Sequence, residues 1–196
     1  SVAGPADNLV VTVQVAPHHH PGTNLPVRDR GVDPGLVIPA HTQPEQRQRV
    51  AAYAIVLSSR GLLATQFSSR TAVPGLWGLP GGGLDHAESA AQAVVREIAE
   101  ETGQVAEIDQ VLDIQSDHWI GRAPSGRIED FHALRIIYAA NCPDPDDPVV
   151  HDVGGTTAAA RWLPVRRWRR FSWTAGFRAV LVKHLPGLVP TEDQPA

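Results

Sequence analysis

Apolar residues along the chain fall into short runs that are separated by turn-forming residues. Runs rich in β-branched and aliphatic residues predict strands at 50–57, 62–67, 105–115, 131–140 and 160–163. Apolar residues at helical spacing predict helices at 89–102 and 174–185, the second ended by Pro186 and Gly187. Strands arranged around two separate helices predict an α/β (α+β) fold in which helices sandwich a mixed β-sheet.

Residues 1–46 differ from the rest of the chain because they hold seven of its 17 prolines. This spacing forbids a long helix and breaks strands into short pieces, so that only Leu9–Val15 is a credible strand there. We expect 1–46 to be a proline-rich N-terminal extension, 47–190 to be the main domain and 191–196 to be a C-terminal tail. The extension would pack on the main domain or on a second subunit, which makes a homodimer an open alternative.

Composition and charge exclude several classes of function. A net charge of −4 argues against binding to a nucleic acid polymer, which favours an excess of positive charge. Cys142 is the only cysteine, so the chain has neither an intrachain disulfide nor a cysteine-based zinc site. No apolar run approaches the roughly 20 residues that span a bilayer. We therefore expect a cytoplasmic protein with no membrane partner.

The sequence marks both ends of the helix at 89–102. Ser89 followed by Gln92 is typical of a capping box, and Gly103 stands where a helix ends in a left-handed residue. An apolar stripe anchors the helix to the core. Its members are Ala91, Val94, Val95 and Ile98.

Three carboxylates, Glu97, Glu100 and Glu101, project from one face of this helix, and Glu88 lies just before it. Like charges at this spacing destabilise a helix, and acids near its C-terminal end also oppose the helix dipole. Arg96 offsets part of the repulsion and is placed to pair with Glu100. The cluster is explained if a hard divalent cation binds between the carboxylates, since Mg²⁺ prefers oxygen ligands.

A solvated acidic face is the alternative interpretation of these glutamates. The preceding segment, Trp77–Gly83, decides between the two, because we expect it to be a loop in which Gly81–Gly83 let backbone groups approach a ligand or metal closely. A metal site is therefore predicted from the glycine loop taken together with Glu88, Arg96 and the three glutamates of the helix.

This arrangement resembles the Nudix hydrolase box, Gly-x5-Glu-x7-Arg-Glu-apolar-x-Glu-Glu-x-Gly-apolar. The box runs here from Gly82 to Gly103 and matches every defining polar position. Two positions depart from it, since Gln104 replaces an apolar residue and Ala87 replaces a frequent glycine. Trp77–Pro80 and Ala160–Pro164 extend the resemblance over most of residues 48–190. It implies a Nudix-type α/β/α sandwich.

The resemblance also implies a reaction, namely cleavage of a diphosphate linkage in a nucleoside diphosphate derivative with Mg²⁺ or Mn²⁺. Glu97, Glu100 and Glu101 would bind the metal, with the Gly81 backbone carbonyl as a further ligand. Arg96 would orient a glutamate in catalysis. Gly82 and Glu88 would support the geometry of loop and helix.

Many relatives use a further acid outside the box as a base or metal ligand, on a loop before a late strand. Here that loop runs over 141–159, and Asp152, beside His151, is the candidate. Glu129 and Asp130, before the strand at 131–140, are the alternatives.

Subfamily markers indicate the substrate. The proline typical of ADP-ribose hydrolases is replaced by Trp119–Ile120, and the tyrosine typical of diadenosine polyphosphate hydrolases by Gly121–Arg122. The chain thus resembles the MutT-like group, whose members often hydrolyse nucleoside triphosphates to monophosphate and diphosphate. An ADP-ribose or nucleotide-sugar pyrophosphatase, or a non-catalytic nucleotide-binding module, are the alternatives.

A nucleotide-like substrate needs stacking surfaces and cationic groups. Trp119 and Phe131 are the candidates for stacking on the base, with Trp77 and Tyr53 as further aromatic residues. The candidates for phosphate contact are Arg122 and Arg127. The competing interpretations are core aromatic residues and solvated loop arginines.

Overall fold

The computed structural model describes residues 27–33, 35–38, 43–123, 125–151 and 154–189, so the strand expected at Leu9–Val15 lies outside the described residues. The strands are β1 Val27–Val32, β2 Glu45–Ser58, β3 Gly61–Phe67, β4 Trp77–Gly78, β5 Gly81–Gly83, β6 Glu107–Arg122, β7 Ile128–Asn141 and β8 Thr157–Leu163. The helices are α1 Ala90–Thr102, the short 3-10 helix η1 Val165–Arg170 and α2 Ala175–Leu188.

One mixed sheet of eight strands organises the chain, in the order β1-β6-β7-β2-β3-β4, with β5 added to β2 and β8 added to β3. Along one edge, β2 pairs in parallel with β7 from Glu45 to Leu57. Along its other edge it pairs first with β5, at Ala51–Tyr53, and then with β3, at Leu57–Ser58. This division of partners places the three glycines of β5 where α1 packs against them.

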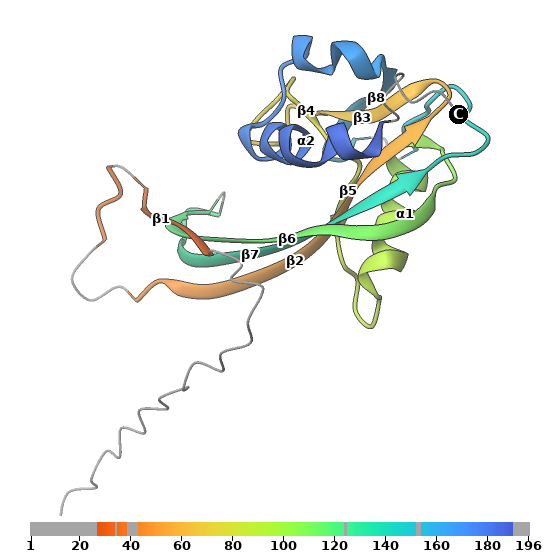
Figure 1. The fold of residues 1–196 in the computed structure, drawn as a ribbon. Helices are drawn as coiled ribbons and strands as arrows, with labels where there is room; N and C mark the ends of the chain where they lie inside the picture. Colours follow the sequence, from red (N-terminus) through yellow and green to blue (C-terminus); the bar gives the residue numbers. More distant parts are fainter. Residues whose placement is uncertain (1–26, 34, 39–42, 124, 152–153, 190–196) are drawn as a thin grey trace, which may run out of the picture.

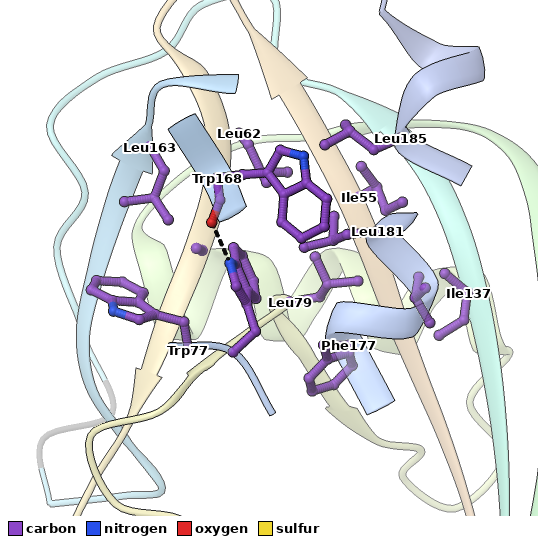
Figure 2. Close-up of a cluster of buried hydrophobic side chains, with 13 residues drawn as sticks. Ile55, Leu62, Trp77, Leu79, Ile137, Leu163, Trp168, Phe177, Leu181 and Leu185 are labelled. Atoms are coloured by element: carbon purple, nitrogen blue, oxygen red, sulfur yellow. Dashed lines mark hydrogen bonds between the residues drawn. The ribbon is translucent and has the colours of Figure 1, made fainter. Parts of the chain in front are cut away.

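The face of the sheet under α2 carries the larger aromatic core. Ile55 of β2 and Ile137 of β7 pack against Phe177 and Leu181 of α2, and all four are buried (Figure 2). The indole N–H of Trp173 donates to the carbonyl of Trp168 at 2.8 Å, so η1 is tied into this core. Because burial of such side chains stabilises each by about 1.5–3 kcal/mol, α2 is held mainly by its apolar face.

The opposite face of the sheet packs on α1. Alternation along β2 turns Ala52 and Ala54 to this side, where they meet Val94 and Ile98 of the helix. Figure 1 shows α1 and α2 on opposite sides of the strands. The expected α/β/α sandwich with a mixed sheet is confirmed.

Several elements differ from the sequence prediction. The expected loop at Trp77–Gly83 contains β4 and β5, because its glycines leave room for close pairing with β2 and β3. The second helix continues through Pro186 to Leu188. Pro186 has no N–H to donate to the carbonyl four residues before it. Because it lies in the last turn of α2, this loss falls at the end of the helix and is tolerated.

The outer strands are longer than the apolar pattern predicted. Polar residues after Gln115 end the apolar run, yet β6 continues to Arg122 and pairs with β7 throughout. β1, within the expected extension, pairs in parallel with β6, and β2 begins at Glu45. In Figure 1 these strands reach well beyond both helices. Within the described residues, no helix is long and apolar enough to cross a membrane.

Candidate active site

α1 forms where its capping signals predict. The Ser89 hydroxyl accepts from the Gln92 backbone N–H, and the Gln92 side chain accepts in turn from the Ser89 N–H at 3.0 Å. Gly103 ends the helix with a φ of 69° and donates its N–H to the Ala99 carbonyl at 2.8 Å. These caps fix the helix in register with the glycine strand β5.

The glycines of β5 bring backbone into direct contact with two carboxylates of α1. The Gly81 N–H donates to Glu101 Oε2 at 3.0 Å. Gly81 has a φ of 135°, and a Cβ there would lie 2.2 Å from the Ala52 carbonyl oxygen. A Cβ on Gly82 would lie 2.4 Å from Glu97 Oε1. Both positions therefore require glycine if Glu97 and Glu101 are to lie against the strand.

Arg96 holds the acidic groups around this strand together. Its guanidinium donates to both oxygens of Glu88, at 2.9 and 3.0 Å, and to the Gly83 carbonyl at 3.1 Å. It also donates to Glu97 Oε1 and to Glu100 Oε2, both at 3.2 Å. One cation thus offsets the repulsion among three carboxylates and ties the helix to the loop before it.

Glu101 is the buried member of the cluster, with an exposed fraction of 8%. The Thr157 hydroxyl, at the start of β8, donates to Glu101 Oε1, while Gly81 binds the other oxygen. Thr157 is itself buried. No sequence pattern predicted this contact, because the two residues are far apart along the chain and a lone threonine belongs to no motif.

The carboxylates differ in their electrostatic surroundings. Burial raises the pKa of Glu97, although the charge of Arg96 and that of the more distant Arg49 act in the opposite direction. Hydrogen bonds from Arg96 and from the Asp85 backbone hold the pKa of Glu88 below its ordinary value. Glu88 is therefore fixed as an anion beside Arg96, as a support for the loop requires.

The donor set suits a hard divalent cation. The carboxylates of Glu97, Glu100 and Glu101 and the backbone of Gly81 offer only oxygen ligands, which Mg²⁺ prefers. Within the described part of the chain, no three His, Cys, Asp or Glu side chains converge as metal ligands, since Glu97 and Glu100 are turned towards Arg96.

Two of the predicted substrate residues face one another across β6 and β7. The rings of Trp119 and Phe131 lie 4.7 Å apart between centroids, tilted by 36°. They line a cavity of about 240 Å³ together with Arg49 and Tyr53 of β2. Burial raises the pKa of Tyr53, although the charges of Arg49 and Arg135 act in the opposite direction. Tyr53 pairs with Gly81, whose N–H donates to Glu101, so the cavity lies near the carboxylates. Arg49 was not predicted from the sequence.

A second cavity, of about 390 Å³, shares Tyr53 and Arg135 with the first and reaches the start of α2 at Phe177. Arg135 donates to the buried Asp117 at 2.6 Å, and Arg30 donates to the same carboxylate at 3.3 Å. The two cavities together form a cleft with two lobes that meet at Tyr53.

The structure does not bring the remaining predicted residues to the carboxylates. Arg122 donates to the Gly126 carbonyl and Arg127 to Glu45, at the β6–β7 turn, about 20 Å along β2 from Ala51. These arginines lie apart from the acidic helix in the single chain.

The two alternative acids also lie away from α1. Glu129 pairs with Arg47 at 3.8 Å, and Asp130 accepts from His118 at 2.5 Å beside a separate cavity of about 530 Å³. Asp152 lies outside the described residues. The segment before it reaches the end of α1, because the His151 N–H donates to the Glu100 carbonyl at 2.9 Å.

The two departures from the box have structural consequences. Ala87 has a φ of 64°, the left-handed conformation that a glycine adopts without strain. Gln104 is buried, and its side-chain oxygen accepts from the Asp146 N–H at 3.0 Å. The amide thereby holds the loop after β7 against the end of α1, which an apolar residue could not do.

Comparison with known proteins agrees with this geometry. A family profile described as the NUDIX domain matches residues 47–183. Nucleoside triphosphatase NudI from Enterobacter sp. (strain 638) is 32% identical over 95 residues, which cover 47% of this chain and 67% of that protein.

Solved structures share the fold. The NUDIX domain of Shewanella oneidensis NrtR, complexed with ADP ribose, superposes with a TM-score of 0.56 at 21% identity, covering 73% of this chain and 90% of that one. A MutT protein from Methanosarcina mazei Go1 gives 0.57 at 17% identity, covering 76% and 100%. The chain belongs to the Nudix hydrolase family, whose domain spans residues 47–183.

Proposed function

We propose that this Nudix hydrolase cleaves a diphosphate linkage in a nucleoside diphosphate derivative, most directly a nucleoside triphosphate, which yields a monophosphate and diphosphate. The observation that carries the proposal is the contact of Glu97 and Glu101 with the glycines of β5. This contact brings the carboxylates of Glu97 and Glu101 beside the backbone of Gly81 and Gly82, so that side-chain and backbone oxygens lie close together. NudI, a nucleoside triphosphatase by name, supports the choice of substrate.

Mg²⁺ or Mn²⁺ is the proposed cofactor. Glu97, Glu100 and Glu101, with the Gly81 carbonyl, would hold it, and when bound it lowers the pKa of water and neutralises phosphate charge. Glu97 and Glu100 would turn from Arg96 towards the metal, while Arg96 stays anchored by Glu88. Asp152 remains the proposed acid outside the box, because its segment reaches α1 at Glu100.

A second candidate substrate is ADP-ribose or a nucleotide sugar. The cleft has two lobes on either side of Tyr53, and a substrate with a group on each side of the diphosphate would fill both. The NrtR domain, whose structure contains ADP ribose, has the same fold. A homodimer also remains a proposal.

A panel of nucleoside triphosphates, ADP-ribose and nucleotide sugars, assayed with Mg²⁺ for monophosphate, phosphate and diphosphate, tests both candidates. We expect Glu101→Gln to lower kcat by about a hundredfold or more, because the buried carboxylate is lost from the metal site. Glu107→Gln, an exposed glutamate at the start of β6, is the matched control and should leave kcat unchanged. Full activity of Glu101→Gln would refute hydrolysis at this site, and binding without turnover by the unmodified chain would indicate a nucleotide-binding module.

A further inference from the structure

Arg49 differs from the other arginines around the cleft in having no carboxylate of the described part of the chain within 4 Å, although its charge acts on the more distant Glu97. Within the described residues, no hydrogen bond or ion pair within 4 Å involves its guanidinium. Arg96 is bound to Glu88, and Arg135 and Arg30, which line the second lobe, are both bound to Asp117. Arg49 is exposed and lines the cavity of Trp119 and Phe131, so its donors face a space that can hold a ligand.

The strand pairing fixes Arg49 between two parts of the site. Ala51 pairs with Gly83 of β5, so Arg49 stands two residues beyond the end of that pairing and on the same face as Ala51. Its Nε and Nη2 lie 3.3 Å from the Cβ position of Gly83, which leaves room for the guanidinium because Gly83 has no side chain. The preceding residue, Gly82, contacts Glu97. Arg49 thus stands next to the glycine strand that contacts two carboxylates of α1.

On the cleft side, Arg49 is a diagonal neighbour of Phe131, because Arg47 pairs with Phe131 and Arg49 pairs with Ala133. Phe131 lies against Trp119, which is its partner on β6. An aromatic surface and an unpaired guanidinium therefore line the same cavity of about 240 Å³. A planar base next to a phosphate is the ligand chemistry that this pair of groups recognises.

We propose that Arg49 binds the phosphate attached to the nucleoside, with the base on the Trp119–Phe131 surface and the bond to be cleaved towards α1. This assignment rests on the proposed function and deepens it, because it identifies the nucleoside 5′-phosphate half of the substrate as the part held in this lobe. The planar fork of arginine donates two parallel hydrogen bonds to phosphate oxygens, whereas lysine donates from one point.

Binding of nucleoside monophosphates in the absence of metal tests the assignment without requiring turnover. AMP, GMP, CMP and UMP, and the four matching nucleosides, are titrated against the unmodified chain and against Arg49→Gln by calorimetry. We expect Arg49→Gln to raise the Kd of the preferred monophosphate by about tenfold and to leave that of its nucleoside unchanged. Arg49→Lys should recover part of the loss.

Arg161→Gln is the matched control, an exposed arginine on β8 that lines neither lobe of the cleft, and it should bind like the unmodified chain. Thermal unfolding of each variant establishes that it is folded. Equal affinity of Arg49→Gln for the monophosphate, equal losses for monophosphate and nucleoside, or no monophosphate binding by the unmodified chain would each overturn the assignment. Absence of hydrolysis across the nucleotide panel would refute the proposed function and leave this binding result unaffected.

Discussion

Ala87, between the glycine strand and α1, has a side chain in a backbone conformation that favours glycine. Its φ of 64° costs an L-residue about 1 kcal/mol. The next residue is Glu88, which Arg96 binds through both carboxylate oxygens. The contacts between Arg96 and Glu88 therefore stabilise the strained backbone at Ala87, in the segment between β5 and α1.

We expect Ala87→Gly to raise the free energy of unfolding by about 0.5 kcal/mol, because relief of strain exceeds the greater chain entropy of glycine in the unfolded state. Urea denaturation measures the change. Ala99→Gly, at an exposed position within α1, is the control and should lower stability by about 1 kcal/mol. A lower stability for Ala87→Gly would show that the left-handed conformation is not strained.

At the scale of elements, α2 is attached to the sheet by a polar contact as well as by its apolar face. Asp113 follows a register shift in β6 and accepts from Lys183 and from His184, both at 3.2 Å. Burial alone would raise the pKa of Asp113, but the hydrogen bonds from His184 and Lys183 outweigh it and hold the pKa below its ordinary value. The carboxylate therefore stabilises the folded state while it is ionised.

Because the pKa of Asp113 is lower in the folded state, its contribution is complete above the ordinary aspartate pKa and is lost as the pH falls through the folded value. We expect Asp113→Asn to lower the free energy of unfolding by about 1–2 kcal/mol at pH 7, with the difference shrinking in acid. Asp109→Asn, an exposed aspartate on the same strand, should have little effect. A deficit that is independent of pH would contradict the ion pairing.

The elements also show what the sequence could and could not predict. α1 was predictable to its last residue, because its caps are local signals. Of the predicted apolar stripe, Val94 and Ile98 are buried as expected, whereas Val95 is exposed and Ala93 is buried in its place. β6 was predicted too short, because residues 116–118 are polar and only the pairing with β7 extends the strand through them. Thr157 and Asp117 were missed, since each acts through a partner that is distant in the sequence.

Arg49 is an intermediate case. The strand was predicted to begin at Val50, one residue after Arg49, whereas β2 begins at Glu45. Alternation along the longer strand places the side chain of Arg49 on the face of Tyr53. Its lack of a carboxylate partner, and the presence of Phe131 and Trp119 beside it, depend on the order of strands in the sheet. A single sequence does not determine that order. The Nudix box could therefore be identified from the sequence, whereas the position of Arg49 in the cleft could not.

At the scale of the whole molecule, the division of β2 between two partners creates the site. β5 and β3 share one edge of β2, so the glycine strand lies against α1, while β2, β6, β7 and the start of α2 line the two lobes of the cleft. The proposed metal ligands and the proposed nucleotide contacts therefore come from different parts of the fold. Reaction and substrate choice can accordingly vary independently.

Dependence of diphosphate-bond hydrolysis on a divalent cation tests the central claim most directly. The full chain is assayed on its best substrate from the panel, first with EDTA and then with Mg²⁺ added in excess over the chelator. We predict no measurable product with EDTA and full recovery with Mg²⁺, because the three glutamates of α1 would act only through a metal that they bind. Turnover in EDTA equal to that in Mg²⁺ would contradict the account.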